Sequence, residues 1–340
     1  MLRPLPTRVI LIISIVIWLG LIALSLTLGR YPVTMTNLYH VLLEPLGLPA
    51  PEVNDIERTV IWTVRMPRIL IASLAGGGLA IAGAVLQGVF RNPLVGPHII
   101  GVSTGATVGG ALSILLGMGS LGLLVSAFGS GMLALLLVFA VTRALPRANT
   151  LAVVLAGVVL SGFFSALVSL IQYAADSEEK MPIIVYWLMG SFSTATYAKL
   201  TLLAVPTLVA IVIILLLAWR INILSLGDDE AKQLHVNVGG LRWVLLICVA
   251  MIVSAQVAVS GSIGWVGLVI PHATRIITGP DHRKLLPVSV MMGAAFMVLV
   301  DDAARTLTGS EIPLSILTAV IGAPVFLYLL RRSQNRGWSG

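Results

Sequence analysis

The chain has 340 residues, of which 58% are hydrophobic and 10% are Asp, Glu, Lys or Arg. Soluble globular domains carry about 25% charged residues, so this composition excludes a water-soluble globular protein. It also excludes a disordered chain, because disordered segments are poor in apolar residues. The mean hydropathy of +1.02 therefore indicates a polytopic membrane protein.

The basic residues that give the net charge of +7 are scattered singly through the predicted loops. This scatter carries topology information and does not indicate a nucleic-acid partner. The one cysteine, Cys248, lies inside an apolar run, so neither an internal disulfide nor a thiol metal cluster is expected. The first apolar run lacks a small-residue cleavage site and is interpreted as a retained anchor.

A helical span needs about 20 apolar residues. The long apolar runs predict an all-α fold in a single domain, 1–340, because barrel strands would alternate over about ten residues. A polar stretch, 29–63, follows the first span, and the segment 182–192 is too short to cross. Ten spans are predicted, at residues 9–28, 69–89, 95–116, 121–142, 150–173, 200–219, 241–260, 263–278, 285–300 and 313–330.

Counting basic residues predicts the orientation. With a cytoplasmic N-terminus, ten spans return the C-terminus to the cytoplasm, and the cytoplasmic segments then hold fourteen Lys and Arg against seven on the other face. An excess of basic residues on the cytoplasmic side is the usual pattern. Both termini are therefore predicted to be cytoplasmic.

The most informative cytoplasmic segment is 224–238. Ser225 and Asp228 have the spacing of a capping box, and acidic residues suit the first turn of a helix. We expect a short amphipathic helix outside the bilayer and a second helix that begins near Asn237. A solvated loop is the alternative, but the insert between Arg220 and Leu241 is longer than a connection needs. A docking surface for a cytoplasmic partner is the preferred interpretation.

Three arginines lie on the predicted outer face. Arg65 and Arg68 flank a proline at the start of a span, and Arg305 follows two aspartates. Arginines near a membrane surface often extend toward lipid headgroups. A guanidinium also matches a carboxylate, so these arginines are equally compatible with docking of an acidic partner protein.

Polar residues at the predicted cytoplasmic helix ends, in the segment 90–94 and at Asn149 and Thr150, either cap helices or narrow a pore. His98 and His272 each follow a proline, and packing is preferred over a metal site because no acidic neighbours accompany them. The sequence has no Walker-type phosphate loop, and no carboxylate is predicted at the middle of a span, where an ion-driven carrier would usually need one. Active transport would therefore draw its energy from another subunit.

A series of motifs resembles the permease subunit of type II ABC importers, the iron-siderophore, haem and vitamin B12 uptake family. The resemblance covers about 65–330, and two positions differ from the common pattern, Gly96 and Trp265. The motifs occur in the family's order at residues 65–68, 83–87, 91–94, 101–106, 187–191, 227–238, 261–272, 281–287 and 311–326.

The resemblance implies ten spans per subunit, a homodimer with the translocation path at its interface, two cytoplasmic ATPase subunits that bind ATP and Mg, and an external substrate-binding protein. No cofactor is implied for this subunit. Three sets of residues match family sites: Arg65, Arg68 and Arg305 for binding-protein docking; Gly227, Asp228, Asp229, Glu230, Ala231, Leu234, Val236 and Val238 for ATPase coupling; Asn92, Leu94, Asn149 and Thr150 for the cytoplasmic gate.

The resemblance thus implies a permease in the prokaryotic cytoplasmic membrane that does no chemistry itself. Its cargo stays open among ferric siderophores, haem, cobalamin and molybdate or tungstate. A secondary carrier or channel without an ATPase is the alternative, and the acidic segment at Asp228 to Glu230 argues against it. An intramembrane enzyme is set aside because no paired nucleophile and base are present.

Overall fold

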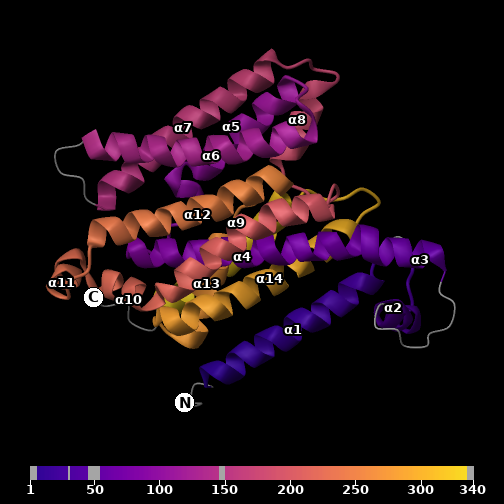
Figure 1. Cartoon of the computed structure of the whole chain (residues 1–340), viewed down its shortest axis with the longest axis horizontal. Helices are drawn as coiled ribbons and strands as arrows, with labels where there is room; N and C mark the ends of the chain where they lie inside the picture. Colours follow the sequence, from indigo (N-terminus) through magenta and orange to yellow (C-terminus); the bar gives the residue numbers. More distant parts are fainter. Residues whose placement is uncertain (1–5, 30, 45–53, 145–149, 335–340) are drawn as a thin grey trace.

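The computed structural model describes residues 6–29, 31–44, 54–144 and 150–334. These residues form helices and connecting loops (Figure 1). The long or apolar helices are α1 Thr7–Thr27, α4 Met66–Val89, α5 Val102–Leu115, α6 Gly119–Ala144, α7 Thr150–Ala174, α9 Tyr197–Leu216, α12 Val238–Ser260, α13 Val266–Thr278, α14 His282–Thr306 and α15 Leu314–Gln334. The shorter elements are α2 Met35–Leu43, α3 Asp55–Thr59, the π-helix Val60–Arg65, α8 Lys180–Leu188, the 3₁₀ turn Pro97–Ile100, α10 Ala218–Leu226 and α11 Asp228–Gln233.

Within the described ranges, eight helices are long and apolar enough to cross a membrane. Two shorter apolar helices, α5 and α13, complete the set. Together, the eight long helices and the two shorter ones correspond in position to the ten predicted spans. The all-α fold class is confirmed. The predicted short segment at 182–192 is α8, which ends at Leu188.

Three predicted boundaries differ from the structure. The span predicted to begin at 95 begins at Val102, because Gly96 is extended, Pro97 opens a 3₁₀ turn and Gly101 has a φ of 83°. The polar stretch 29–63 contains α2 and α3, and a π-helix continues α3 into α4. α14 runs six residues past the predicted end at 300, so Asp301 and Asp302 lie inside it. They stand near the C-terminal end of α14, so this helix has no carboxylate at mid-span.

The buried centre of the fold is α4, which packs against α14, α13, α9 and α12. Glycines allow the closest approaches. A Cβ on Gly76 would overlap the carbonyl oxygen of Gly293 in α14, and one on Gly83 would overlap the carbonyl oxygen of Gly267 in α13. Small residues let helix backbones approach closely in lipid, where no hydrophobic drive brings helices together. This packing accounts for the glycine-rich sequence of α4.

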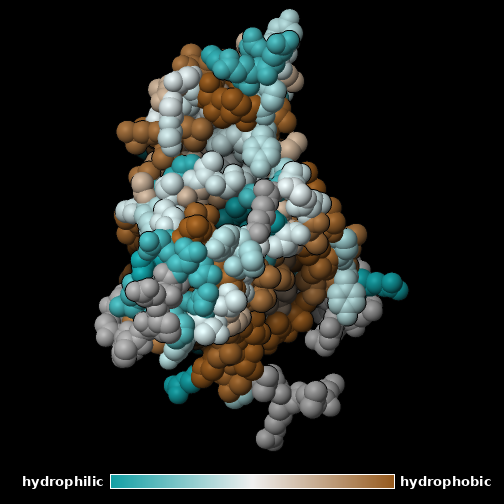
Figure 2. Space-filling view, turned by 90° about the vertical axis from the view of Figure 1, so that its right-hand side faces the viewer, coloured by the Kyte–Doolittle hydropathy of each residue, from teal (hydrophilic) through white to brown (hydrophobic). Residues whose placement is uncertain are grey.

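The helices run between two ends of the bundle. We call them the α11 end, which carries α10 and α11, and the α8 end, which carries α3 and α8 (Figure 1). α1 begins at the α11 end, and α14 and α12 also begin there. Figure 2 looks onto the α8 end: hydrophilic and intermediate residues cover much of the middle of this face, and hydrophobic residues lie below and along its flanks. This distribution suits an end that meets water between apolar sides that meet lipid.

Candidate functional site

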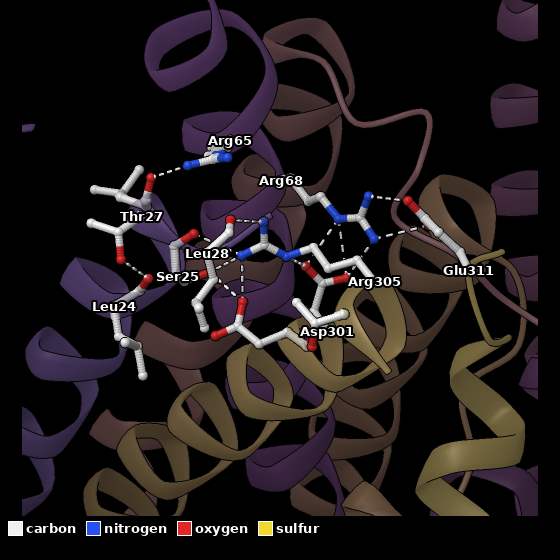
Figure 3. A network of polar contacts seen from close by, with 12 residues as sticks. Leu24, Ser25, Thr27, Leu28, Arg65, Arg68, Asp301, Arg305 and Glu311 are labelled. Carbon is white, nitrogen blue, oxygen red and sulfur yellow. Dashed lines mark hydrogen bonds and ion pairs between the residues drawn. The ribbon is translucent and has the colours of Figure 1, made fainter. Parts of the chain in front are cut away.

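A network of arginines and carboxylates lies at the α8 end of α4 and α14 (Figure 3). Arg68 donates from Nε and Nη2 to the carboxylate of Asp301, at 2.9 Å for the shortest contacts. Its Nη1 also donates to Oε1 of Glu311 at 2.7 Å. The Arg68 side chain is 11% exposed and that of Asp301 is 1% exposed. One guanidinium therefore joins α4 to α14 and to the loop before α15.

Arg65 and Arg305 bind the last turn of α1. Arg65 donates to the carbonyl oxygens of Leu26 and Tyr31. Arg305 donates to the carbonyl oxygens of Leu28 and Ser25, each at 2.7 Å, and pairs with Asp302. α1 has no basic residue in its own last turn. The two arginines therefore supply the donors that the C-terminal carbonyls of a helix otherwise lack.

Three carboxylates, Asp301, Asp302 and Glu311, balance the three arginines, and every guanidinium in the network has partners within the chain. The family resemblance implies that these arginines receive acidic residues of a binding protein. They are largely buried and paired within the chain, so an incoming carboxylate would have to replace one of their present partners. Asp301 and Asp302 stand four and three residues before Arg305. Residues at these spacings face each other on a helix, so this spacing is the sequence signal for the internal pairing.

At the α11 end, α11 is the short helix predicted between 224 and 238. The predicted cap is wrong: Ser225 lies in α10 and donates to the carbonyl of Asn222, and Gly227 precedes α11 without a side-chain cap. The second helix does begin after Asn237, which caps it, but that helix is the long α12. Two leucines that flank α11, Leu226 and Leu234, are 64% and 56% exposed.

The predicted coupling residues divide between two sides of this segment. Ala231 is fully buried, and Gly227 and Val238 are buried with it. Asp229, Glu230 and Leu234 are exposed, whereas Asp228 and Val236 are half-buried. The exposed members form a surface that a partner can contact, and the buried members hold that surface to the bundle.

Side-chain bonds tie α10 and α11 to the starts of two long helices. Arg242 of α12 donates to both oxygens of Asp228 at 3.0 Å. Asn222 of α10 donates to Asp281, and its Oδ1 accepts from the backbone N–H of His282 in α14, at 2.7 and 2.8 Å. The hydrogen bond from Arg283, together with that from Asn222, lowers the pKa of Asp281 to about 2. These bonds connect α10 and α11 to the starts of α12 and α14.

A cleft of about 610 Å³ separates α11 from the loop after α4 and the start of α7. Its polar lining includes Arg91, Asn92 and the three acidic residues of α11, and Leu151 and Val154 form its apolar wall. Arg91 has a φ of 50°, in the left-handed region. The N–H groups of Arg91 and Asn92 bond to the carbonyls of Gly88 and Gln87, which is a Schellman cap that ends α4.

The predicted gate residues meet at this cleft only in part. Oδ1 of Asn92 accepts from the N–H of Leu94 at 2.9 Å, and the Leu94 side chain is 51% exposed. Thr150 is the first residue of α7, and the neighbouring Leu151 lines the cleft. Asn149 lies outside the described residues. The structure thus brings Asn92 close to the start of α7, where Thr150 stands.

A second cavity, of about 350 Å³, lies between two segments of the chain: 94–99, which enters the 3₁₀ turn Pro97–Ile100, and 263–268, which enters the first turn of α13. Leu79 of α4 also lines it and stands ten residues before Val89, which is about 15 Å along a helix. His98 lies in this lining, with its Nε2 3.2 Å from the carbonyl oxygen of Ile263. Trp265 has a φ of 66° and packs against Gly322 of α15. The cavity is therefore near the middle of the bundle, beside α15.

Sequence reasoning missed Glu311, Asn222 and Arg242 as members of these sites. Their partners are 243, 60 and 14 residues away along the chain. Local spacing gives no signal at the two larger separations. In the part of the chain that the structure describes, no group of three His, Cys, Asp or Glu residues is placed to hold a metal ion. His272 is buried and packs edge-on against Phe326.

The described chain is a polytopic helical bundle with a polar, partner-accessible segment at one end, which is the architecture of a multi-pass transport protein. Comparison with known proteins defines it further. The model of the FecCD transport family matches residues 15–332, and the chain belongs to this family. It is a permease of the type II ABC importers, whose ATPase is a separate subunit.

Three relatives illustrate the match. The molybdate import system permease protein MolB of Haemophilus influenzae is 48% identical over 92% of this chain and 93% of its own length. The hemin transport system permease protein HmuU of Yersinia pestis is 35% identical over 83% of this chain and 86% of its own length. A solved structure described as an inward-facing metal-chelate type ABC transporter is 46% identical, with a TM-score of 0.86 over 96% of this chain and 99% of that chain.

Proposed function

We propose that this chain is the membrane subunit of a homodimeric, binding-protein-dependent importer whose ATPase subunits seat on α11. The observation that carries this proposal is the tethering of α10 and α11 to α12 and α14 through Asp228–Arg242 and through Asn222 with Asp281 and His282. A partner that moves α11 therefore moves two membrane-spanning helices. Packed helices switch between discrete arrangements, so such a movement exchanges one opening of the path for the other.

The α11 end is proposed to be cytoplasmic, which places both termini in the cytoplasm. Two features of the end support this. The exposed Leu226 and Leu234 lie outside the predicted spans and flank the same short helix, where a partner that covers both would bury their apolar surface. The three acidic residues of α11 stand beside them and present carboxylates to a basic partner surface.

The translocation path is proposed to pass the cavity beside His98 and Trp265. Irregular backbone at membrane depth occurs where protein covers it or where it lines a water-filled path. The stretches 94–96 and 263–265 lie outside the helices and meet at this depth. A second copy of the chain, packed along α15, would enclose the cavity between two subunits.

The substrate-binding protein is proposed to dock at the α8 end, with the network around Arg68 as its contact. Asp301 is inaccessible, but the Glu311 side chain is 24% exposed at the edge of the network. A carboxylate of the binding protein would therefore compete with Glu311 for Arg68. This exchange would free the loop before α15 when the binding protein arrives.

The cargo is proposed to be an oxyanion of the molybdate class. The support is the Haemophilus influenzae relative, which is 48% identical over 92% of this chain. A metal chelate is the second candidate, because the solved structure at 46% identity is described as a metal-chelate type transporter. Titrating the cognate binding protein with molybdate, tungstate and a ferric chelate separates the two: micromolar or tighter binding of one class alone identifies the cargo.

The ATPase contact is tested by co-purification. Leu226→Glu combined with Leu234→Glu should remove the apolar contact and abolish co-elution of the ATPase subunit with the permease. Leu307→Glu is the matched control, because Leu307 is 65% exposed at the opposite end of the bundle. Equal co-elution from both variants would contradict the proposal.

A secondary carrier needs an ionisable group that loads and releases a coupling ion. Asp301 and Asp302, which lie inside α14, are each paired with arginine. Concentrative uptake by the permease alone, reconstituted in sealed vesicles with an ion gradient and no ATPase, would establish the carrier instead.

A further inference from the structure

A large cavity at the α8 end has no part in the sites described above. It measures about 890 Å³ and lies between the end of α5, the start of α6, α8 and the end of α12. Its lining includes several hydroxyls, an indole and one amine, namely Ser113, Ser120, Tyr186, Trp187, Ser191, Ser193, Thr194, Ser260 and Lys199. We call it the polar cavity. No Asp or Glu is among the residues that line it.

An apolar groove of about 250 Å³ continues from the polar cavity, with which it shares Ala258 and Val259. Its other lining residues are Leu121, Leu124, Val125, Phe128, Gly129, Leu202 and Ala255, from α6, α9 and α12. Leu121 and Val125 are 68% and 64% exposed. The groove is therefore open along its side, where exposed apolar side chains border it.

The two hollows are arranged along the bundle axis. On α6, Ser120 lines the polar cavity and Phe128 lines the groove eight residues further on, which is about 12 Å deeper. On α9, Lys199 precedes Leu202, and α12 reaches Ala255 before Ser260. All three helices thus place the polar lining toward the α8 end and the apolar lining toward the middle of the bundle.

Charge and composition match one class of occupant. The Lys199 ammonium donates to Oγ1 of Thr194 at 2.6 Å, which uses one of its three donors. Tyr186 and Trp187 also line the polar cavity, and these residue types concentrate at the level of lipid headgroups. A basic residue at this level attracts an anionic headgroup by about 1 kcal/mol.

We infer that the polar cavity and the apolar groove together bind an anionic glycerophospholipid from the leaflet at the α8 end. Its phosphate lies against Lys199 and the serine and threonine hydroxyls, and one acyl chain lies in the groove between α6, α9 and α12. A soluble oxyanion would use only the polar cavity and would leave the groove without a function.

Two variants separate the headgroup from the chain. Lys199→Gln removes the charge, and Lys180→Gln is its matched control, since Lys180 lies at the same end and does not line the cavity. Gly129→Leu fills the groove, because a Cβ at Gly129 meets no atom within 4 Å. Gly20→Leu is the control for it, because Gly20 has the same open surroundings on α1.

The experiment is native mass spectrometry of the full-length chain in mild detergent, titrated with phosphatidylglycerol and with phosphatidylcholine of the same chains. We expect Lys199→Gln to weaken phosphatidylglycerol binding about fivefold, the factor that corresponds to about 1 kcal/mol per basic residue, and to remove the preference over phosphatidylcholine. Gly129→Leu should weaken both lipids, and both controls should bind as the wild type does.

Two results would overturn the inference. The first is equal phosphatidylglycerol binding by the wild type, Lys199→Gln and Gly129→Leu. The second is displacement of the lipid by millimolar inorganic phosphate or molybdate, which would identify a soluble-anion site instead.

Discussion

Arg68 in α4 and Asp301 in α14 form a buried ion pair across 233 residues of sequence, in which both Nε and Nη2 of the guanidinium donate to the carboxylate. Glu311 occupies the remaining side of the same guanidinium. The pair joins two closely packed helices, α4 and α14, at their α8 ends. Its planar geometry is one that lysine does not reproduce.

Removing one partner of this pair should be strongly destabilising. Asp301→Ala leaves the buried Arg68 with Glu311 alone, and breaking a buried pair costs about 3–5 kcal/mol. Arg58→Ala is the control, since the Arg58–Glu44 pair is exposed and such pairs contribute about 0–1 kcal/mol. The measurement is thermal unfolding in detergent, followed by tryptophan fluorescence. Equal losses for the two variants would show that the network around Arg68 is accessible to water.

The contact between Gly76 and Gly293 predicts a second large effect. Gly76→Ala places a methyl group where the Gly293 carbonyl lies, so α4 and α14 must separate, at a cost of about 1–3 kcal/mol. Gly20→Ala adds the same methyl group to α1 without a neighbour within 4 Å. It should be neutral or stabilising, because alanine favours helix more than glycine does. Comparison of the two unfolding midpoints checks the prediction, and a stable Gly76→Ala would contradict it.

The number and type of helices follow from sequence because each span needs a long apolar run, and runs such as 121–142 are uninterrupted. The backbone conformation at the start of the run 95–116 could not be predicted in this way. Residues 95–101 are apolar enough to read as helix, yet Pro97 and the left-handed Gly101 keep them outside α5. Hydropathy records burial in lipid and not the backbone conformation.

At the candidate site, by contrast, the residues that the sequence did not reveal are those whose partners are brought together only by the packing of distant helices. Asp301 and Asp302 read as loop residues because a charge inside a span is costly. Their cost is offset by Arg68 and Arg305, and the Arg68 partnership is formed only when α4 and α14 pack together. The short helix α11 was predicted correctly because its acidic first turn is a local signal. The predicted cap of this helix was wrong, because the Ser225 hydroxyl donates to the carbonyl oxygen of Asn222 within α10.

Arg91 predicts a gain in stability. Its left-handed φ of 50° costs a residue with a Cβ about 1–2 kcal/mol, and glycine is the usual residue at this position of a Schellman cap. Arg91→Gly should therefore raise the free energy of unfolding by about 1 kcal/mol. Arg91→Ala removes the same side chain but keeps the Cβ, so it should give no gain. The two variants separate backbone strain from side-chain contacts, and a gain for both would assign the effect to the guanidinium.

Asp281 predicts a dependence of stability on pH. Its pKa in the folded protein is about 2, against an ordinary value of 3.8, so the folded state binds the proton less tightly than the unfolded state. The stabilisation is complete above about pH 4 and is lost as the pH falls toward 2. It amounts to at most about 2 kcal/mol.

Thermal unfolding of the wild type and Asp281→Asn between pH 5 and pH 2 measures this effect. The wild type should lose more stability than Asp281→Asn over the lower part of that range. Asp229→Asn is the control, because the Asp229 side chain is 87% exposed, and it should follow the wild type. Parallel curves for all three proteins would show that Asp281 does not titrate differently on folding.

The capping of α1 by Arg65 and Arg305 has a consequence for biogenesis. The acceptor carbonyls of Ser25 and Leu28 leave the ribosome 280 and 277 residues before the guanidinium that binds them. During synthesis, the carbonyl oxygens of Ser25 and Leu28 at the end of α1 therefore lack these hydrogen-bond donors until Arg305 has been made. Arrival of α14 closes the bundle, so a nascent chain truncated before Arg305 should leave α1 exposed to membrane quality-control proteases.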